Sequence, residues 1–328
     1  MSETVVVTGA TSGMGRAIAR RFADEGAKIG LIARGRDGLE AVKREVEERG
    51  GEALILPGDV SDHAFVEASA SAVEEAFGPI DIWVNNAMTT IFSFFTDIEP
   101  EEFQRATDVT YHGFVWGTQA ALKRMSERDR GTIVLVGSAM AYRGIPLQSP
   151  YCGAKHATKG FFESIRTELR HKGSNVHMTM VQLPGHNTPQ FDHCRSKMPK
   201  YPMPVPPIFE PEVAADAVHW AAHNKRREVY VGVSSVYTIL GNKIAPWLAE
   251  RYLARTAVSG QQTDPEVDGV REGNLFESTD LDPGARGRYS DQAHSHSIQL
   301  WATKHRRALL GGLVAVVAAA GAGGALRD

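Results

Sequence analysis

Short apolar runs alternate along the first 256 residues with longer segments whose apolar residues recur at helical spacing. Continuous β-branched runs are typical of strands that are buried on both faces, and the longer segments predict amphipathic helices such as Gly13–Glu25 and Asp37–Arg49. Strands that alternate with helices require right-handed crossovers, so the pattern predicts an α/β fold with a doubly wound parallel sheet of about seven strands. The predicted strands are Thr4–Val7, Ile29–Ala33, Ala53–Leu56, Ile80–Val84, Thr132–Val136, Val176–Leu183 and Val229–Val231.

Two further zones follow this single domain of residues 1–256. Residues 257–303 are polar and show little periodicity, so we expect an extension or linker that lies on the domain or stays mobile. Residues 304–328 begin with a basic cluster, which is followed by an uncharged run at residues 308–326. A helix of that length reaches about 28 Å, close to the ~30 Å hydrocarbon core of a bilayer. The tail is therefore a candidate membrane anchor, and the alternatives are a docked helix or a mobile tail.

Composition narrows the functional classes. The chain has 328 residues and a net charge of −3, so no strongly basic surface for nucleic acid is expected. Two cysteines exclude a disulfide framework and favour a reducing compartment such as the cytoplasm, with membrane association through the tail. The first residues lead directly into an apolar strand without a basic segment, so no secretory signal is expected.

A glycine-rich loop lies between the first predicted strand and the first predicted helix. Its glycines follow the spacing G-x-x-x-G-x-G, at Gly9, Gly13 and Gly15. Gly9 permits a tight turn, Gly13 lets the backbone approach a pyrophosphate, and Gly15 lets the helix pack close to the strand. In this βαβ context the loop predicts a Rossmann-like dinucleotide site, although a glycine-rich turn without a ligand is the alternative.

The end of the second strand bears on the choice of dinucleotide. An acidic residue that would bind ribose hydroxyls is absent there, and Arg34 takes its place. A guanidinium suits a 2′-phosphate, so we expect NADP(H) to be preferred over NAD(H), with Arg34 as the main contact. Arg36 is expected to be a solvated surface residue, and a plain surface charge is the alternative for Arg34.

Several motifs in a fixed order resemble the short-chain dehydrogenase/reductase family over roughly residues 3–235. They are the glycine loop, Asp59-Val60, Asn85-Asn86-Ala87, Ser138, Tyr151-Cys152-Gly153-Ala154-Lys155 and Pro184-Gly185. The resemblance implies an oxidoreductase that transfers a hydride between NADP(H) and a carbonyl or secondary alcohol.

The spacing of Tyr151 and Lys155 has a chemical reason. Residues four apart share one face of a helix, so a lysine ammonium can lower the pKa of the tyrosine, which is otherwise near 10. Tyr151 can then exchange a proton with a carbonyl or alcohol oxygen, and the Ser138 hydroxyl can orient the same oxygen. Taken singly, Ser138 could be a helix cap, Tyr151 a core residue and Lys155 a solvated one.

The resemblance also implies the remaining roles. Lys155 would bind the nicotinamide ribose, Asp59 would lie by the adenine, Asn86 by its ribose, and Thr188 at the nicotinamide or phosphate end. A homo-oligomer paired through the helices that carry Tyr151 and Thr110 is implied as well. The expected cofactor-binding residues are Gly9, Thr11, Ser12, Gly13, Met14, Gly15, Arg34, Asp59, Val60, Asn86, Ala87, Tyr151, Lys155, Pro184, Gly185 and Thr188.

Two positions depart from the family pattern. Thr110 stands where the family has an asparagine that helps hold a water leading to the lysine, so Thr110 is expected to take over part of that catalytic role. Met88 stands where glycine is usual and is expected to narrow the nicotinamide pocket. Both departures leave open a second hypothesis, a membrane-tethered, nucleotide-sensing binding protein with little or no turnover.

The substrate is expected above the nicotinamide, within reach of residues 88–95, 139–149 and 186–209. The last segment is rich in proline, phenylalanine and methionine, which predicts a stiffened apolar lid and a small apolar carbonyl or alcohol, such as a lipid, steroid or terpenoid. The alternative is that these aromatic residues only pack the domain. No metal is expected, because His186, His193 and Cys194 are irregularly spaced.

Overall fold

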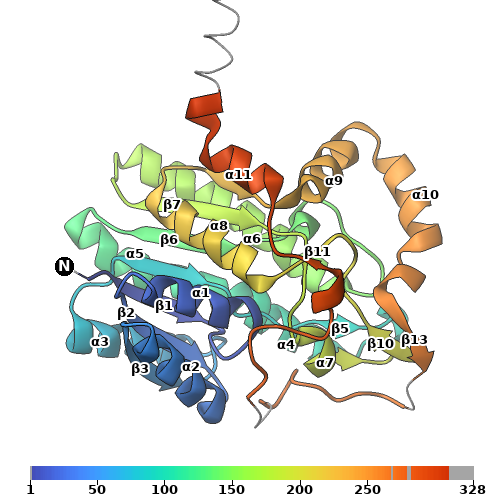
Figure 1. Ribbon diagram of the computed structural model, residues 1–328, viewed down its shortest axis with the longest axis horizontal. Coiled ribbons are helices and arrows are strands. Elements are labelled where there is room, and N and C mark those ends of the chain that lie inside the picture. The colour runs from blue at the N-terminus through green and yellow to red at the C-terminus, as the bar shows by residue number, and fades with distance from the viewer. Residues whose placement is uncertain (1, 267–268, 279–281, 310–328) are drawn as a thin grey trace, which may run out of the picture.

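A parallel sheet of seven strands forms the centre of the molecule, with the order β12-β7-β6-β4-β1-β2-β3 (Figure 1). This arrangement confirms the predicted doubly wound fold, and the predicted strand bounds differ from the observed ones by at most two residues. The strands are β1 (Thr4–Thr8), β2 (Lys28–Ala33), β3 (Glu52–Pro57), β4 (Ile82–Asn85), β6 (Thr132–Val136), β7 (His177–Gln182) and β12 (Glu228–Tyr230).

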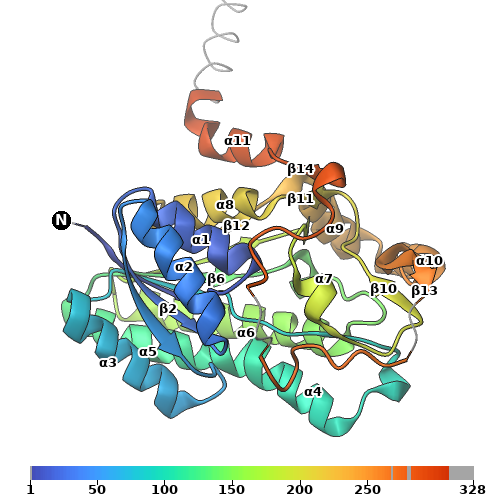
Figure 2. The ribbon, with the colours of Figure 1, turned by 60° about the horizontal axis from the view of Figure 1, so that its bottom comes forward.

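Helices cover both faces of this sheet, which explains the continuous apolar strands (Figure 2). One face packs against α1 (Gly13–Ala23), α2 (Arg36–Glu48) and α8 (Pro211–His223). The other face packs against α3 (His63–Phe77), α5 (Gly113–Arg128) and α6 (Ser149–His171). The carboxyl ends of the strands remain free of these layers, and the loops that leave them build the site.

Shorter elements surround that edge of the sheet. They include α4 (Pro100–Thr107), which continues through a π-helical turn η2 (Asp108–His112) into α5, and the turn η3 (Ala139–Ala141). Two helices, α9 (Gly232–Ile244) and α10 (Pro246–Thr256), follow β12. Small sheets join β5 (Ile91–Phe92) to β9 (Arg195–Ser196), and β8 (Gly185–His186) to β11 (Ile208–Phe209). The helix α7 (Gln190–His193) and strand β10 (Lys200–Pro202) complete this region.

The computed structural model describes residues 2–266, 269–278 and 282–309. Within these ranges the polar zone 257–303 lies on the domain. Its strand β13 (Gln262–Glu266) pairs with β10, and β14 (Ala293–His294) pairs with β11. Leu275, Ala285 and Leu300 are buried, the last on α11 (Ile298–Lys304). The described residues of this zone therefore pack on the domain, which is one of the two expected alternatives.

Most of the candidate anchor, residues 310–328, lies outside the described residues. Among the described residues, no helix has both the length and the apolar character needed to cross a membrane.

Candidate active site

The glycine loop brings α1 against the end of β1 more closely than any side chain would allow. A Cβ on Gly15 would lie 2.0 Å from the carbonyl oxygen of Gly9. Gly9 itself has a φ of +68°, in the left-handed region, and a Cβ there would lie 2.7 Å from Ala87 Cα. The local sequence folds this way because only glycine permits both conditions. As a result, the N-terminus of α1 opens onto a cleft at the strand ends, where its free amides can face an anion.

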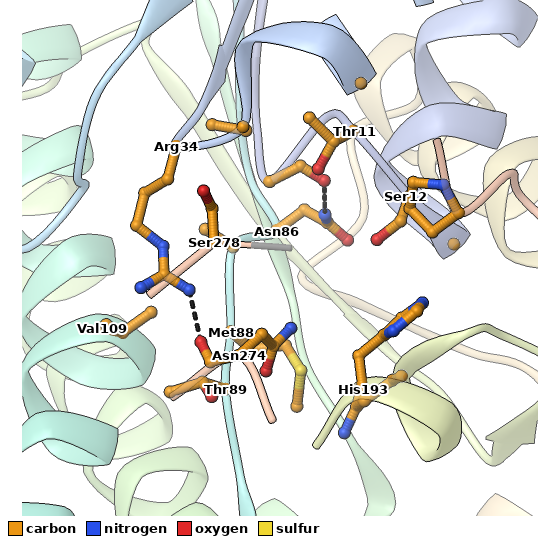
Figure 3. Close-up of a pocket in the computed structure, with 18 of the residues that line it drawn as sticks. Thr11, Ser12, Arg34, Asn86, Met88, Thr89, Val109, His193, Asn274 and Ser278 are labelled. Carbon is orange, nitrogen blue, oxygen red and sulfur yellow. Dashed lines mark hydrogen bonds between the residues drawn. The ribbon is translucent and has the colours of Figure 1, made fainter. Parts of the chain in front are cut away.

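This cofactor cleft has a volume of about 150 Å³ (Figure 3). Its walls come from the segments that follow β1, β2, β3, β4 and β8, together with Val109 and residues of the polar zone. The expected cofactor residues in its walls are Gly9, Thr11, Ser12, Gly13, Met14, Arg34, Asp59, Val60, Asn86, Ala87 and Thr188. Gly15 lies behind the loop, where it sets the approach of the helix instead of contacting the cleft.

Asn86 is held rigidly at the floor of the cofactor cleft. Its main-chain N–H donates to Thr8 Oγ1 at 2.9 Å, and its side-chain Nδ2 donates to the Thr8 carbonyl at 3.0 Å. Its Oδ1 is buried and has no partner among the described residues. A buried acceptor of this kind is costly unless a ligand or water donates to it. Asn86 therefore holds a fixed acceptor that is open to a donor in the cofactor cleft.

Asp59 is charged and fixed in the same cleft. Arg105 on α4 pairs with it, and Ser61 donates to it from its amide at 2.9 Å and from its hydroxyl at 2.8 Å. Burial alone would raise the pKa of Asp59, but these donors outweigh burial and lower it. No motif pointed to Arg105, because it lies 46 residues from Asp59 in the sequence.

The guanidinium of Arg34 lies in the cleft but is not free. It donates to the main-chain carbonyls of Asn274 and Leu275 and, at 2.8 Å, to that of Phe276 (Figure 3). Burial, reinforced by the nearby charge of Arg105, lowers the pKa of Arg34. The expectation of an arginine open to a phosphate is therefore corrected in one respect: neutral oxygens of the chain already accept from it.

These carbonyls belong to residues 271–278, which we call the cofactor strap. Leu275 anchors the strap by packing, fully buried, against Ile91 and Ala106. Arg105 donates to the Leu275 carbonyl at 3.0 Å, and the Asn274 amide donates to the His193 carbonyl at 2.7 Å. Asn274 and Ser278 then form part of the cleft wall. Sequence reasoning missed the strap, because a polar segment without periodicity carries no signal of where it packs.

A second cavity of about 490 Å³ adjoins the cleft, and we call it the substrate cavity. Met14, Asn86, Met88, Thr188 and Gln190 line both spaces, so the two meet at this group of residues. Met88 lies at the junction, where it was expected to narrow the nicotinamide pocket. The expected catalytic residues Ser138, Tyr151 and Lys155 line this cavity. Pro184 and Gly185, which were expected at the cofactor, line it as well and do not line the cofactor cleft, whereas Thr188 lines both.

The walls of the substrate cavity are mainly apolar. The predicted segments 139–149 and 186–209 supply Met140, Ile145 and Phe191, among other residues. The helices α9 and α10 supply the wall that sequence reasoning missed, through Ser234, Ser235, Tyr237, Thr238, Tyr252 and Leu253.

Helix α6 carries Tyr151 and Lys155 on one face, and both reach the substrate cavity. Lys155 is 2% exposed, with Nζ 5.5 Å from the centre of the Tyr151 ring and 4.5 Å from that of Phe114. Its Nζ donates to the Val136 carbonyl at 2.8 Å. Ser138 Oγ accepts from the Met140 amide at 3.2 Å, as an N-cap of η3. The Ser138 hydroxyl therefore keeps its own proton for donation to another oxygen.

Burial shifts both titrating groups toward their neutral forms. It lowers the pKa of Lys155 to about 7, since no carboxylate compensates the ammonium. It also raises the pKa of Tyr151, and a hydrogen bond with Ser138 opposes that rise. Near neutral pH the phenol is protonated and can act as a proton donor, and the lysine beside it is about half protonated, so its charge depends on pH.

Thr110 does not line the cleft or the cavity. It lies fully buried in the π-helical turn η2, where its hydroxyl donates to the Thr89 carbonyl at 2.9 Å and accepts from the Thr89 amide at 3.0 Å. Since Thr89 does line the cofactor cleft, Thr110 acts on the site through that main chain. The expected part of Thr110 in the proton path stays a prediction, and the contacts that the structure shows are those that fix Thr89.

Residues 2–266, 269–278 and 282–309 contain no group of three His, Cys, Asp or Glu side chains that could hold a metal ion. His186 is buried, with Nδ1 3.0 Å from the Pro184 carbonyl, and burial lowers its pKa to about 4.

Comparisons with known proteins agree with this geometry. The family described as short chain dehydrogenase matches residues 3–199. An uncharacterized oxidoreductase, YxnA, of Bacillus subtilis is 32% identical over 97% of this chain and 90% of its own. The solved structure of an alcohol dehydrogenase from the archaeon Thermococcus sibiricus, complexed with 5-hydroxy-NADP, superimposes with a TM-score of 0.61 at 25% identity. That alignment covers 70% of this chain and 96% of the archaeal one.

A more distant relative is similar over part of its length only. The bovine 3-ketodihydrosphingosine reductase is 34% identical over 57% of each chain. The family match spans more than half of the present chain and the YxnA alignment nearly all of it. The chain therefore belongs to the short-chain dehydrogenase family of oxidoreductases.

Proposed function

We propose that the chain reduces an apolar ketone or aldehyde with NADPH, with Tyr151 as the general acid. The observation that carries this proposal is the position of Tyr151, Ser138 and Lys155 on one wall of a mainly apolar cavity of about 490 Å³. The cavity adjoins the cleft of the glycine loop, so a nicotinamide and a carbonyl could meet where the two spaces join. The printed name of the bovine relative, a reductase of a keto-lipid, supports the same substrate class.

The residues of the cleft fit a nicotinamide dinucleotide. The close approach of α1 to β1 at Gly15 leaves the first amides of α1 open to a pyrophosphate. The Oδ1 atom of Asn86 has no hydrogen-bond donor among the described residues, so a bound ligand could donate to it. The proposed preference for NADP(H) rests on Arg34. Its guanidinium can bind a 2′-phosphate through two hydrogen bonds once its bonds to the strap carbonyls are broken. When bound, the cofactor would supply or accept the hydride.

The chain's own residues would handle the proton. Ser138 donates a hydrogen bond to the substrate carbonyl oxygen and fixes its position. Tyr151 donates its phenolic proton to that oxygen, and Lys155 in its charged form stabilises the tyrosinate that remains. Burial favours the protonated phenol, which is the form that a general acid needs to start the reduction.

The replacement Tyr151→Phe tests this proposal. NADPH oxidation with a panel of apolar ketones should fall by a factor of about 10²–10⁴, while NADPH binding persists. Tyr142→Phe is the matched control, because the Tyr142 hydroxyl bonds to Glu228 and does not line the cavity. Retained turnover in Tyr151→Phe would refute the assigned acid. Nucleotide binding without turnover in the unmodified chain would favour the nucleotide-sensing alternative.

The homo-oligomer remains a prediction, and light scattering of the full chain would test it. A contact through α6 and the turn that carries Thr110 should be lost when exposed residues of α6 are replaced by glutamate.

A further inference from the structure

Helix α9 displays an apolar stripe to solvent. Val233, Tyr237, Leu240 and Ile244 recur at helical spacing and are 62, 60, 53 and 82% exposed. The opposite side of the helix is the buried one, with Ser234, Ser235 and Ile239. A surface helix normally directs its apolar stripe toward the core, so this polarity is reversed.

Helix α10 extends this apolar surface. None of its residues is buried, although it carries Trp247, Leu248 and Tyr252, which are 58, 54 and 66% exposed. We call the seven apolar side chains of the two helices the α9–α10 face. They are Val233, Tyr237, Leu240, Ile244, Trp247, Leu248 and Tyr252. Exposed apolar side chains gathered on two neighbouring helices are typical of an interaction site.

Basic residues outnumber acidic ones in the helices that carry and border the α9–α10 face, although the chain as a whole is slightly acidic. One of these cations, Lys304, is paired with Asp216 of α8. Residues 232–256 and 298–309 contain six lysines and arginines and one acidic residue. The Arg251 guanidinium lies 5.5 Å from the centre of the Trp247 ring, next to the apolar surface. Apolar and aromatic side chains bordered by cations match the interface of an anionic bilayer, where aromatic rings lie among headgroups.

The end of the described chain lies beside the first of these two helices. Helix α11 contacts α9 (Figure 1). Its Ile298 and Trp301 are 84 and 54% exposed. The basic cluster follows α11 directly, and no charged residue occurs in the sequence from residue 308 to residue 326.

The substrate cavity opens at this surface. Tyr237 and Tyr252 line the cavity and also belong to the exposed α9–α10 face, so the two features share an edge. An apolar molecule in the outer part of a bilayer would therefore meet the cavity mouth without crossing water.

We propose that the α9–α10 face docks on an anionic phospholipid bilayer and that the apolar substrate enters the cavity from the lipid between Tyr237 and Tyr252. The docking step stands independently of catalysis, whereas the entry step rests on the proposed function. A second copy of the chain is the less favourable occupant. A twofold contact would place two basic surfaces of like sign against each other.

Site-specific fluorescence on the full chain tests the docking step. Both native cysteines are buried, so a cysteine introduced by Ile244→Cys would carry an environment-sensitive dye selectively. Glu48→Cys, at the exposed end of α2, is the control. With brominated phosphatidylcholine–phosphatidylserine vesicles, we expect quenching at residue 244 and none at residue 48. No quenching at 244, or equal quenching at both, would overturn the proposal.

A pair of charge insertions gives a second, quantitative test. Leu240→Glu/Ile244→Glu should weaken binding of the full chain to phosphatidylserine-containing vesicles about tenfold. The control Ala64→Glu/Ala68→Glu places two glutamates at the same spacing on exposed positions of α3, and vesicle affinity should stay unchanged. Neither Leu240 nor Ile244 lines the cavity, so turnover of a water-soluble ketone should also be unchanged.

The two readouts separate docking from catalysis. With a ketone dissolved in the vesicles, the Leu240→Glu/Ile244→Glu chain should lose turnover in parallel with binding. Vesicle binding without turnover of any ketone would leave docking supported and refute the proposed function. If the double variant changes the oligomeric state and leaves vesicle binding intact, the face is an interface between copies, and the docking proposal is wrong.

Discussion

The guanidinium of Arg34 donates to the main-chain carbonyl of Phe276 at 2.8 Å, although 242 residues separate the two in the sequence. This bond joins the end of β2 to the cofactor strap, at the point where a 2′-phosphate would have to bind. The strap carbonyls accept hydrogen bonds from the Arg34 guanidinium, as a phosphate would. These bonds also compensate the cost of burying its positive charge. If NADP(H) is the cofactor, as proposed, its 2′-phosphate would have to replace these carbonyls, and the choice of cofactor would then depend on the strap.

Replacing Arg34 by alanine should reduce NADPH affinity much more than NADH affinity. Hydrogen bonds to charged groups are worth about 1.5–3 kcal/mol, so NADPH binding should weaken about 10- to 100-fold. Fluorescence titration with both nucleotides measures the ratio. Arg36→Ala is the control, because the Arg36 side chain is 64% exposed and two residues away. Equal weakening for both nucleotides would show that Arg34 does not contact the phosphate.

Replacing Leu275 by asparagine should release the strap, because the position is fully buried against Ile91 and Ala106. An amide there would lose apolar burial and lack a partner. With the carbonyls gone from Arg34, NADPH should bind several-fold more tightly, by removal of a competing conformation. Val270→Asn, at a position 52% exposed, should change nothing. Weaker NADPH binding in a chain that still melts cooperatively would mean that the strap contributes contacts to the cofactor.

Replacing Lys155 by methionine should stabilise the fold while it abolishes activity. Burial lowers the Lys155 pKa from 10.5 to about 7. Below about pH 7 both states carry the proton, so the folded chain bears the full cost of a buried charge. Between pH 7 and 10.5 only the unfolded chain binds that proton, so the wild-type free energy of unfolding rises with pH.

The increase in the free energy of unfolding that Lys155→Met causes should therefore be greatest at low pH and vanish near pH 10.5. We expect a few kcal/mol at roughly pH 6 and much less at roughly pH 10, from urea denaturation at each pH. Lys123→Met is the control, because the Lys123 side chain is 54% exposed. A gain that is independent of pH would indicate packing, not removal of charge, as its source.

Gly15→Ala should lose both stability and cofactor binding. A Cβ there would lie 2.0 Å from the Gly9 carbonyl oxygen, so α1 would have to move away from β1. Thermal unfolding and NADPH titration measure the two effects. Gly160→Ala is the control within α6, where a Cβ meets nothing within 4 Å and should stabilise the helix by about 0.5–1 kcal/mol. A Gly15→Ala chain that binds normally would contradict the close approach.

Much of the fold was predictable, because its signals are local. Apolar periodicity placed the seven strands of the sheet within two residues, and β6 at its observed bounds, since burial on both faces demands continuous apolar runs. The glycine loop and the Tyr151–Lys155 spacing are equally local. Each depends on backbone freedom or helix geometry within seven residues, so the sequence alone could indicate a nucleotide site beside a proton donor.

The tertiary structure decided the features whose partners lie far apart in the chain. The bonds of Arg34 to the strap carbonyls and the bonds of Thr110 to Thr89 could not be predicted from any motif. Arg105 on Asp59, and α9 and α10 as a cavity wall, left no trace in any motif. The position of the strap depends on hydrogen bonds to its carbonyls and on the packing of Leu275. The residues that make these contacts come together only when the sheet has formed, so the sequence of the strap alone does not indicate where it packs.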